Sequence, residues 1–284
     1  GFTLDEKGMK MSKSLGNAVS PDQVIKQYGA DILRLWVAQS DYTSDLRIGN
    51  EILKGVADSY RRLRNTYRFL LGSLVDFDDN LEIVRYEDLP ELEKWVLHRL
   101  TELDDLVREG YHSYSFQMVF QQIFHFCTID LSSFYFDIRK DSLYCDSASS
   151  TLRRSTRTVL SHLFDRLTTW LAPILPFTTE EVWFERFANV NSSIHMEDFP
   201  ETSKDWFNEE LATKWDAIRQ VRRVVTGAIE VHRQNKTIGS SLEASPSVYI
   251  NEEELFAKIQ SIDFAEICIT SSLDINMNEI SSEM

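Results

Sequence analysis

The 284-residue chain lacks the features that mark membrane proteins, secreted disulfide scaffolds and zinc-binding proteins. No apolar run approaches the roughly twenty residues that a transmembrane helix needs, and no charged-then-apolar leader opens the sequence. The three cysteines (Cys127, Cys145 and Cys268) lie far apart and form no Cys-x-x-Cys pair, which argues against a disulfide framework or structural zinc. We therefore expect a cytoplasmic protein with no membrane segment and no metal site.

Basic charge is also scarce, because 30 lysines and arginines face 45 acidic residues and leave a net charge of −15. Phosphate binding is largely electrostatic, so this balance counts against a nucleic-acid partner. Several arginines are nevertheless clustered, within residues 61–68, 153–157 and 219–223. The acidic surplus can face away from such clusters, and the charge alone leaves nucleic-acid binding open.

One short stretch, Lys10-Met11-Ser12-Lys13-Ser14, carries the clearest chemical signal. It places two ammonium groups three residues apart, and Gly8 and Gly16 on either side allow tight turns or close approach to a ligand. Lysine is a compact charge on a flexible stem, suited to phosphate charge that moves during a reaction. A solvated surface loop is the alternative, but this pentapeptide should arise by chance in only about one in ten thousand chains of this length.

The remainder of the chain is predicted to be mainly α-helical. Ser20 and Gln23 form a capping box ahead of a helix that ends near Tyr28, and a second, mostly buried helix should follow over residues 30–39. Apolar residues at steps of three and four then predict long helices. Their expected ranges are 51–74, 92–107 with Gly110 beyond the end, 115–140 in the middle of a bundle, 152–171 and 208–235. A second capping box at Thr178 should start a short helix, and strands over 247–250 and 265–270 should flank a helix over 252–260.

The pentapeptide, together with Leu15-Gly16-Asn17 after it, resembles the KMSKS signature of class I aminoacyl-tRNA synthetases. The resemblance implies that residues Lys10, Met11, Ser12, Lys13 and Ser14 bind ATP during formation of the aminoacyl-adenylate. It assigns Lys13 to the leaving pyrophosphate and Lys10 to a supporting contact, which makes these two lysines the catalytic candidates. The segment 29–36 resembles the stretch after the signature in synthetases for branched aliphatic amino acids, and we expect it to dock the loop on the next domain.

Further stretches resemble isoleucyl-tRNA synthetases in particular, and they occur in the same order along the chain. They are residues 61–66 with 68–72, 126–138, 171–178 and 238–244. The resemblance implies that residues 1–48 end a catalytic domain, 49–236 form a helical anticodon-binding bundle, and 237–284 form a small α/β piece with a tail. The His-Ile-Gly-His motif, the Rossmann-type amino-acid site and the editing domain of that family are absent from the sequence. We therefore expect a C-terminal part of a longer enzyme, inactive alone.

The implied reaction joins isoleucine to tRNA(Ile) with ATP and Mg²⁺, in a monomeric enzyme without zinc in this part. Candidates for tRNA contact are Arg219, Arg222, Arg223 and Arg233 on the last long helix, with Arg61, Arg64 and Arg68 as a second face. For each arginine, a solvated helix face paired with nearby acids is the alternative. Two other functions stay open: a valyl- or leucyl-type synthetase, and a stand-alone tRNA-binding or assembly module without catalysis.

Overall fold

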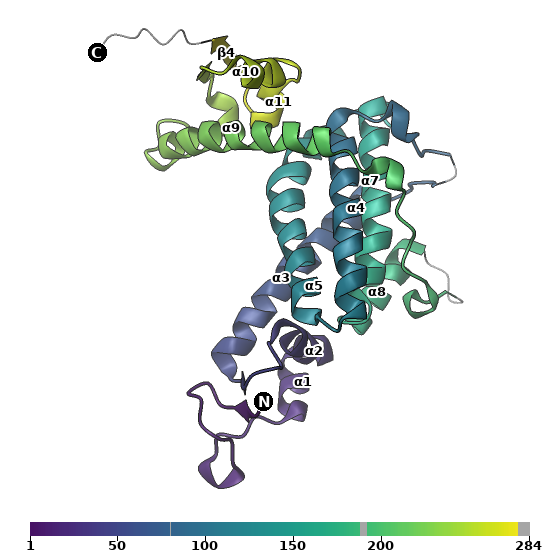
Figure 1. Ribbon diagram of the computed structural model, residues 1–284, viewed down its shortest axis with the longest axis vertical. Helices are drawn as coiled ribbons and strands as arrows, with labels where there is room; N and C mark the ends of the chain where they lie inside the picture. The colour runs from purple at the N-terminus through teal and green to yellow at the C-terminus, as the bar shows by residue number, and fades with distance from the viewer. Residues whose placement is uncertain (80, 188–191, 278–284) are drawn as a thin grey trace. The chain divides into compact units, whose positions relative to one another are not determined.

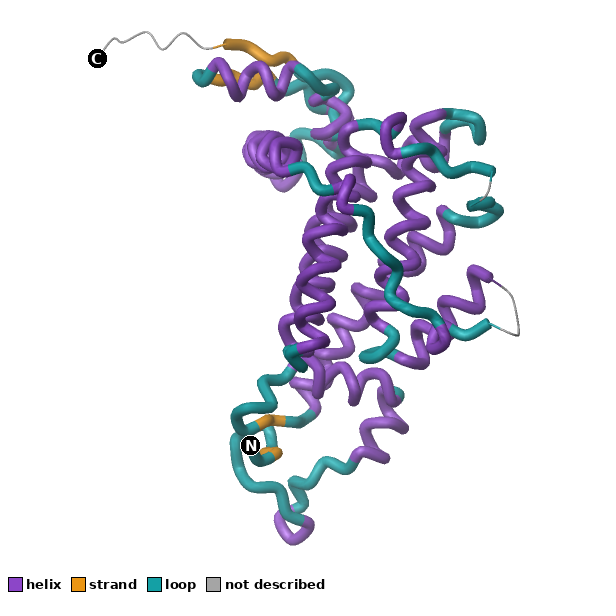
Figure 2. The backbone as a smooth tube through the Cα atoms, turned by 45° about the vertical axis from the view of Figure 1, so that its right-hand side comes forward, coloured by secondary structure: helices purple, strands orange, loops and turns teal. Residues whose placement is uncertain are grey.

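The computed structural model describes residues 1–79, 81–187 and 192–277. It divides into two compact units, Gly1–Phe207 (unit 1) and Asn208–Met284 (unit 2). Within the described residues most of the chain is helical and the strands are short, which confirms the mainly α prediction (Figures 1 and 2). None of the described helices combines the length and apolar character needed to cross a membrane.

Unit 1 begins with a small parallel pairing of two strands and continues as a set of helices. Its strands and α-helices are β1 (Thr3–Leu4), α1 (Pro21–Tyr28), α2 (Ala30–Gln39), β2 (Leu46–Arg47), α3 (Asn50–Ser73), α4 (Glu91–His112), α5 (Phe116–His125), α6 (Phe136–Cys145), α7 (Thr151–Leu171) and α8 (Pro176–Phe187). A π-helical turn, η3 (Phe126–Tyr135), joins α5 to α6, and short 3-10 turns cover Lys13–Leu15, Tyr86–Asp88, Ile194–Met196 and Lys204–Trp206. The predicted capping box is confirmed, because Ser20 Oγ accepts from the Gln23 amide at 3.3 Å and Gln23 Oε1 accepts from the Ser20 amide at 3.2 Å.

The long helix α7 packs against both α3 and α4, and α5 packs against α4 (Figure 1). The segment 115–140 was predicted to lie in the middle of this bundle, and Gln121, His125 and Ser132 on it are exposed. The most completely buried helix is α7, including Thr156, Thr158, Thr168 and Thr169. Thr158 and Thr168 donate to the carbonyls four residues earlier at 2.9 and 2.6 Å, so their hydroxyls enter the core satisfied.

A charged pair lies inside this core. Glu93 on α4 is fully buried, and its carboxylate accepts two hydrogen bonds from the Arg139 guanidinium at 2.6 and 2.9 Å. The hydroxyls of Tyr135 and Thr156 donate to the same carboxylate at 3.2 and 3.3 Å. The pair therefore has the additional hydrogen bonds that a buried ion pair needs to offset its desolvation.

Gly110 lies inside α4, although the sequence suggested that it follows the helix. A Cβ atom built at this position would stand 2.4 Å from Cγ2 of Val119 and 2.8 Å from Cε of Met118. The missing side chain allows α5 to approach α4 closely, which is a packing role and not a helix stop.

Unit 2 carries one long helix and a small α/β piece. Its elements are α9 (Glu209–Gln234), a 3-10 turn (Ser241–Glu243), β3 (Ser247–Ile250), α10 (Glu253–Gln260), α11 (Phe264–Cys268) and β4 (Asp274–Met277). Strands β3 and β4 pair in parallel, with Val248 opposite Ile275. The predicted strand over 265–270 was wrong, because Asp263 caps a helical turn there by accepting from the Glu266 amide at 3.0 Å, and Ile269 ends that turn with φ 56°.

Candidate functional site: the Lys10–Ser14 loop and the arginine faces

The loop that carries Lys10 and Lys13 begins as a tight hairpin after β1. Leu4 forms an antiparallel bridge with Lys10, and the Asp5 amide donates to the Met9 carbonyl at 2.9 Å. Gly8 turns the chain with φ 77°, a left-handed conformation that favours glycine. The hairpin fixes the point from which the lysine-rich segment projects.

The segment itself folds into a short 3-10 turn, η1 (Lys13–Leu15). Ser12 starts the turn, since its hydroxyl accepts from the Leu15 amide at 3.2 Å, and Gly16 ends it with φ 66°. Both lysines are exposed. Within the described residues the ammonium groups of Lys10 and Lys13 make no hydrogen bond or ion pair, so both charges are available to an anionic ligand.

Asn17 is the residue whose contacts with the loop sequence reasoning missed, because it appeared there only as part of the string after the signature. Its side-chain amide donates to Asp5 Oδ2 at 2.9 Å and to the Lys10 carbonyl at 3.3 Å, while its Oδ1 accepts from the Ser12 amide at 2.9 Å. Asp5 also accepts from the Met9 amide at 2.8 Å. The Asn17 hydrogen bond, followed by that of the Met9 amide, lowers the pKa of Asp5.

The hairpin is also attached to α3. Glu6 Oε1 accepts from the Glu51 amide at 2.6 Å, in the first turn of that helix. Gly49 precedes the helix and supplies no side-chain cap, and a Cβ built there would stand 1.8 Å from Glu6 Cγ. The Glu6 carboxylate thus takes the place of an N-cap, and glycine at position 49 gives it room.

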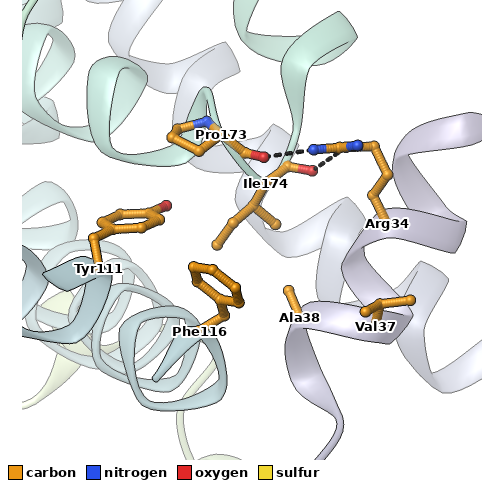
Figure 3. A pocket seen from close by; sticks show the side chains of 7 residues that line it. All are labelled: Arg34, Val37, Ala38, Tyr111, Phe116, Pro173 and Ile174. Carbon is orange, nitrogen blue, oxygen red and sulfur yellow. Dashed lines mark hydrogen bonds between the residues drawn. The ribbon is translucent and has the colours of Figure 1, made fainter. Parts of the chain in front are cut away.

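Helix α2 is docked on the corner between α7 and α8. The buried Asp31 carboxylate accepts from the Thr178 amide and hydroxyl at 2.8 and 2.6 Å. Arg34 donates to the carbonyls of Pro173 and Ile174 at 2.7 and 3.2 Å (Figure 3). The expected capping box at Thr178 was wrong, because α8 starts at Pro176 and receives its capping carboxylate from Asp31.

A cavity of about 330 Å³ lies beside this joint (Figure 3). Apart from Arg34, its lining is Val37, Ala38, Tyr111, Phe116, Pro173 and Ile174. The Tyr111 hydroxyl donates to the Trp170 carbonyl at 2.5 Å, and the Arg34 guanidinium is bound to carbonyls. The cavity is mainly apolar and offers no arrangement suited to a nucleotide.

The arginines of α3 line a hollow of about 590 Å³ between α3 and α8. Arg61 forms an ion pair with Asp58, and Arg64 reaches the Tyr60 hydroxyl at 3.3 Å and Glu181 at 3.6 Å. Arg68 is exposed and has no ion-pair partner in the part of the chain that the structure describes. Of this face, Arg68 is the cation most available to a phosphate.

The α9 arginines differ in exposure. Arg222 is partly buried and donates to the Ile267 carbonyl at 2.7 Å, which holds α11 against α9. Arg219 is partly buried, and the exposed Arg233 pairs with Glu230 at 2.9 Å. Arg223 is exposed and makes no ion pair within residues 208–277. Arg223 is therefore the best placed of these four for a polyanion.

The third arginine cluster serves the fold. Arg157 donates to the carbonyls of Ser73 and Val75 at 3.1 and 2.5 Å and pairs with Glu82 at 2.9 Å. Arg153 donates to the Asp146 carbonyl at 2.7 Å.

Residues 1–79, 81–187 and 192–277 contain no group of three or more His, Cys, Asp or Glu side chains that could hold a metal ion.

Comparison with known proteins identifies the family. A family model for the anticodon-binding domain of tRNA ligases matches residues 93–249. The chain belongs to this family. A second family model, for class I tRNA synthetases of the I, L, M and V types, matches residues 1–49, which include the lysine loop.

Curated relatives of the chain carry the name isoleucine–tRNA ligase. The protein of Ruegeria pomeroyi is 59% identical over 283 residues, which cover 100% of this chain and 29% of the relative. That of Agrobacterium fabrum is 54% identical, over 97% of this chain and 28% of the relative, and that of Bartonella henselae 52%, over the same two shares. The chain thus spans less than a third of the length of the curated relatives it matches.

Among solved structures, the chain is similar to the ternary complex of Agrobacterium radiobacter agnB2 LeuRS, tRNA and LeuAMS. The TM-score is 0.56 at 19% sequence identity, over 73% of this chain and 24% of the other. At this identity the likeness shows the fold alone.

Proposed function

We propose that this chain is the part of an isoleucine–tRNA ligase that supplies the nucleotide-binding loop and the anticodon-binding helices. The observation that carries the proposal is the pair of exposed ammonium groups, Lys10 and Lys13, on a loop whose own backbone is fixed by Asn17. The identity of 59% to an isoleucine–tRNA ligase along the whole chain favours isoleucine over valine or leucine as the amino acid. The intact loop also disfavours a module that only binds RNA or assembles with proteins.

In this proposal, the isoleucine carboxylate attacks the α-phosphate of ATP and pyrophosphate leaves. Negative charge grows on the β- and γ-phosphates as the bond breaks, and Lys13 stabilises that charge while Lys10 supports the contact with the nucleotide. Met11, Ser12 and Ser14 complete the ATP-binding segment, and Mg²⁺ enters with the ATP phosphates as part of the substrate. Such fixed or loop-borne cations act because they are placed where charge develops in the transition state.

The helical part then holds tRNA(Ile) through exposed arginines. Arg223 on α9 and Arg68 on α3 are the first candidates, since neither has an ion-pair partner among the described residues. Arg61, Arg64, Arg219 and Arg233 are second candidates, and Arg222 is third because it already holds the Ile267 carbonyl. We further propose that the enzyme is a cytoplasmic monomer.

The loop's role is tested in the complete enzyme with Lys13→Ala. Loss of one cation from the transition state should lower ATP–pyrophosphate exchange by about 10²- to 10³-fold. Binding of tRNA should remain within about twofold, since Lys13 is on the nucleotide loop. Lys7→Ala is the matched control, because Lys7 is exposed on the same hairpin and outside the signature. Exchange at the wild-type rate in Lys13→Ala would refute the assignment.

The arginine contacts are tested by filter binding of tRNA(Ile) over a range of salt concentrations. If Arg223 contacts a phosphate, Arg223→Ala should reduce the slope of log K against log salt by about 1. The same change is expected for Arg68→Ala, whereas Arg153→Ala should leave the slope unchanged because that guanidinium is held by the Asp146 carbonyl. Unchanged slopes in both exposed-arginine variants would exclude these positions.

A further inference from the structure

The lysine loop depends on one side chain for its attachment. Between residues 10–16 and the rest of the described chain, the hydrogen-bonded ties are the Leu4–Lys10 bridge and the bonds of Asn17. The other bonds of the segment are internal, such as Gly16 amide to Lys13 carbonyl at 3.2 Å and Ser12 hydroxyl to Ser14 hydroxyl at 3.1 Å. Asn17 thus closes the loop from its C-terminal side.

Asn17 is held in turn by Asp5. One oxygen of this carboxylate, Oδ2, accepts from the Asn17 amide, and the other, Oδ1, accepts from the amides of Lys7 and Met9 at 3.0 and 2.8 Å. The hairpin therefore orients Asp5, Asp5 orients Asn17, and Asn17 fixes the main chain at Lys10 and Ser12. These are the two residues that immediately flank Met11 and lead into the turn of Lys13.

We propose that Asp5 and Asn17 form a clasp that positions the ammonium groups of Lys10 and Lys13 for the triphosphate. Asn17 is then a positioning residue for adenylate formation and does not itself touch the nucleotide. The inference rests on the function proposed for the loop. A purely structural role for the clasp is disfavoured, because Asn17 and Asp5 are only partly buried and the segment they fix is largely exposed.

The clasp has a reciprocal test, because donor and acceptor can be exchanged. In Asn17→Asp, two carboxylates would face each other across the 2.9 Å contact that now joins Asn17 Nδ2 to Asp5 Oδ2. In the double variant Asp5→Asn/Asn17→Asp, the amide now introduced at position 5 can donate to the carboxylate introduced at position 17. The bonds to the Ser12, Lys7 and Met9 amides are kept, but the 3.3 Å bond to the Lys10 carbonyl is lost, because a carboxylate oxygen at position 17 cannot donate to it.

The experiment measures ATP–pyrophosphate exchange in the complete enzyme for wild type, both single variants, the double variant and Lys13→Ala. Misplacement of catalytic groups by about 1 Å can cost as much as 10²-fold, so we expect Asn17→Asp to lower kcat at least about tenfold. The KM for isoleucine should stay within about twofold, since the clasp acts on the nucleotide loop. The double variant should recover to within about threefold of wild type, with tRNA binding unchanged throughout.

The outcomes separate this inference from the function on which it rests. Normal exchange in Lys13→Ala would overturn the loop's function itself. Loss of exchange in Lys13→Ala, with wild-type rates in Asn17→Asp or no recovery in the double variant, would overturn the clasp alone. If Asn17→Asp does not fold, the single variant Asp5→Asn tests the clasp in its place, because it brings two amide donors face to face. The proposal then requires that Asp5→Asn lowers kcat and that the double variant Asp5→Asn/Asn17→Asp restores it.

Discussion

Two titratable residues one turn apart on α7 should oppose each other in the pH dependence of unit 1 stability. Burial lowers the pKa of His162 to about 4, with Arg166 acting in the same direction and Asp79 against it. The folded protein therefore keeps His162 neutral while an unfolded chain, with a pKa of 6.5, takes up a proton. Below pH 6.5 this difference favours unfolding, and between pH 7.5 and 5 it should cost about 2 kcal/mol.

Asp165 behaves in the opposite way. Burial raises its pKa from 3.8 to about 6, while Arg186 and Arg166 oppose the rise and Asp79 and Glu197 add to it. As pH falls through 6, the folded state binds a proton that the unfolded state does not yet bind, so stability increases. From pH 7.5 to 5 this gain should be about 1 kcal/mol, which masks part of the loss at His162.

Substitutions at His162 and at Asp165 should therefore change the pH dependence of the free energy of unfolding in opposite directions. Relative to wild type, His162→Phe should gain about 2 kcal/mol of unfolding free energy between pH 7.5 and 5, because the proton uptake by the unfolded state is removed. Asp165→Asn should lose about 1 kcal/mol over the same interval, because the protonation that favours the folded state is removed. The ring of phenylalanine keeps the contact with Trp206, whose centroid lies 4.9 Å from that of His162.

The assay is urea unfolding followed by tryptophan fluorescence at several pH values. Of the six tryptophans, Trp215 is in unit 2 and the others are in unit 1, so the signal reports mainly on the unit that contains α7. Differences between variant and wild type are compared, because they cancel the titration of the other acidic groups. Parallel profiles for wild type and both variants would refute the reasoning, as would changes of the reverse sign.

Two further predictions concern packing and docking in unit 1. Asp31→Ala removes the carboxylate that caps α8 and leaves buried donors unsatisfied, so the free energy of unfolding in urea should fall by about 2 to 4 kcal/mol. The control Asp22→Ala, at the exposed start of α1, should change that free energy by less than about 0.5 kcal/mol. Equal effects of the two substitutions would contradict the docking role of Asp31. Gly110→Ala should create a clash with the buried Val119, which lowers the melting temperature and reduces the free energy of unfolding by about 1 to 3 kcal/mol. Adding Val119→Ala should recover part of that loss. An unchanged melting temperature in Gly110→Ala would argue against close packing of α4 and α5 there.

Local signals in the sequence predicted local structure well. The range expected for α2 is that observed, and the capping box of α1 is present in both directions. The strand expected over 265–270 failed because its apolar residues follow Asp263, whose side chain caps a helical turn. A short apolar run does not distinguish a strand from a buried helical turn, and here the cap decided.

Burial was predicted less well, because hydrophobicity alone ranks helices by composition. Segment 116–145 is richer in aromatic residues than α7, yet α7 is the more buried. Thr158 and Thr168 bind the carbonyls of their own helix, which removes the cost of taking a hydroxyl out of water. A prediction based on hydrophobicity does not include that saving, so it did not single out α7 as the most buried helix.

In the candidate site too, sequence reasoning identified local features but not the contacts between distant residues. Lys10 and Lys13 were identified because they belong to one short string, whereas Asn17 acquires its role only when Asp5, twelve residues earlier, is folded beside it. Among the arginines, sequence pattern did not separate Arg222, bound to a carbonyl, from the exposed Arg223 next to it. In both cases the missing information is the partner, which a single sequence does not give.

The attachment of the loop region to the helices of unit 1 follows one electrostatic scheme. Glu6 reaches the first turn of α3, and Asp31 reaches the first turn of α8. In both places, a carboxylate from the first 48 residues meets the positive end of a helix dipole and the unpaired amides there. Gly49 provides α3 with no side-chain cap of its own, so that helix is capped from a distance. Because the hairpin that carries Glu6 also carries Asp5, the side chain that orients Asn17 is one residue away from the side chain that anchors the hairpin.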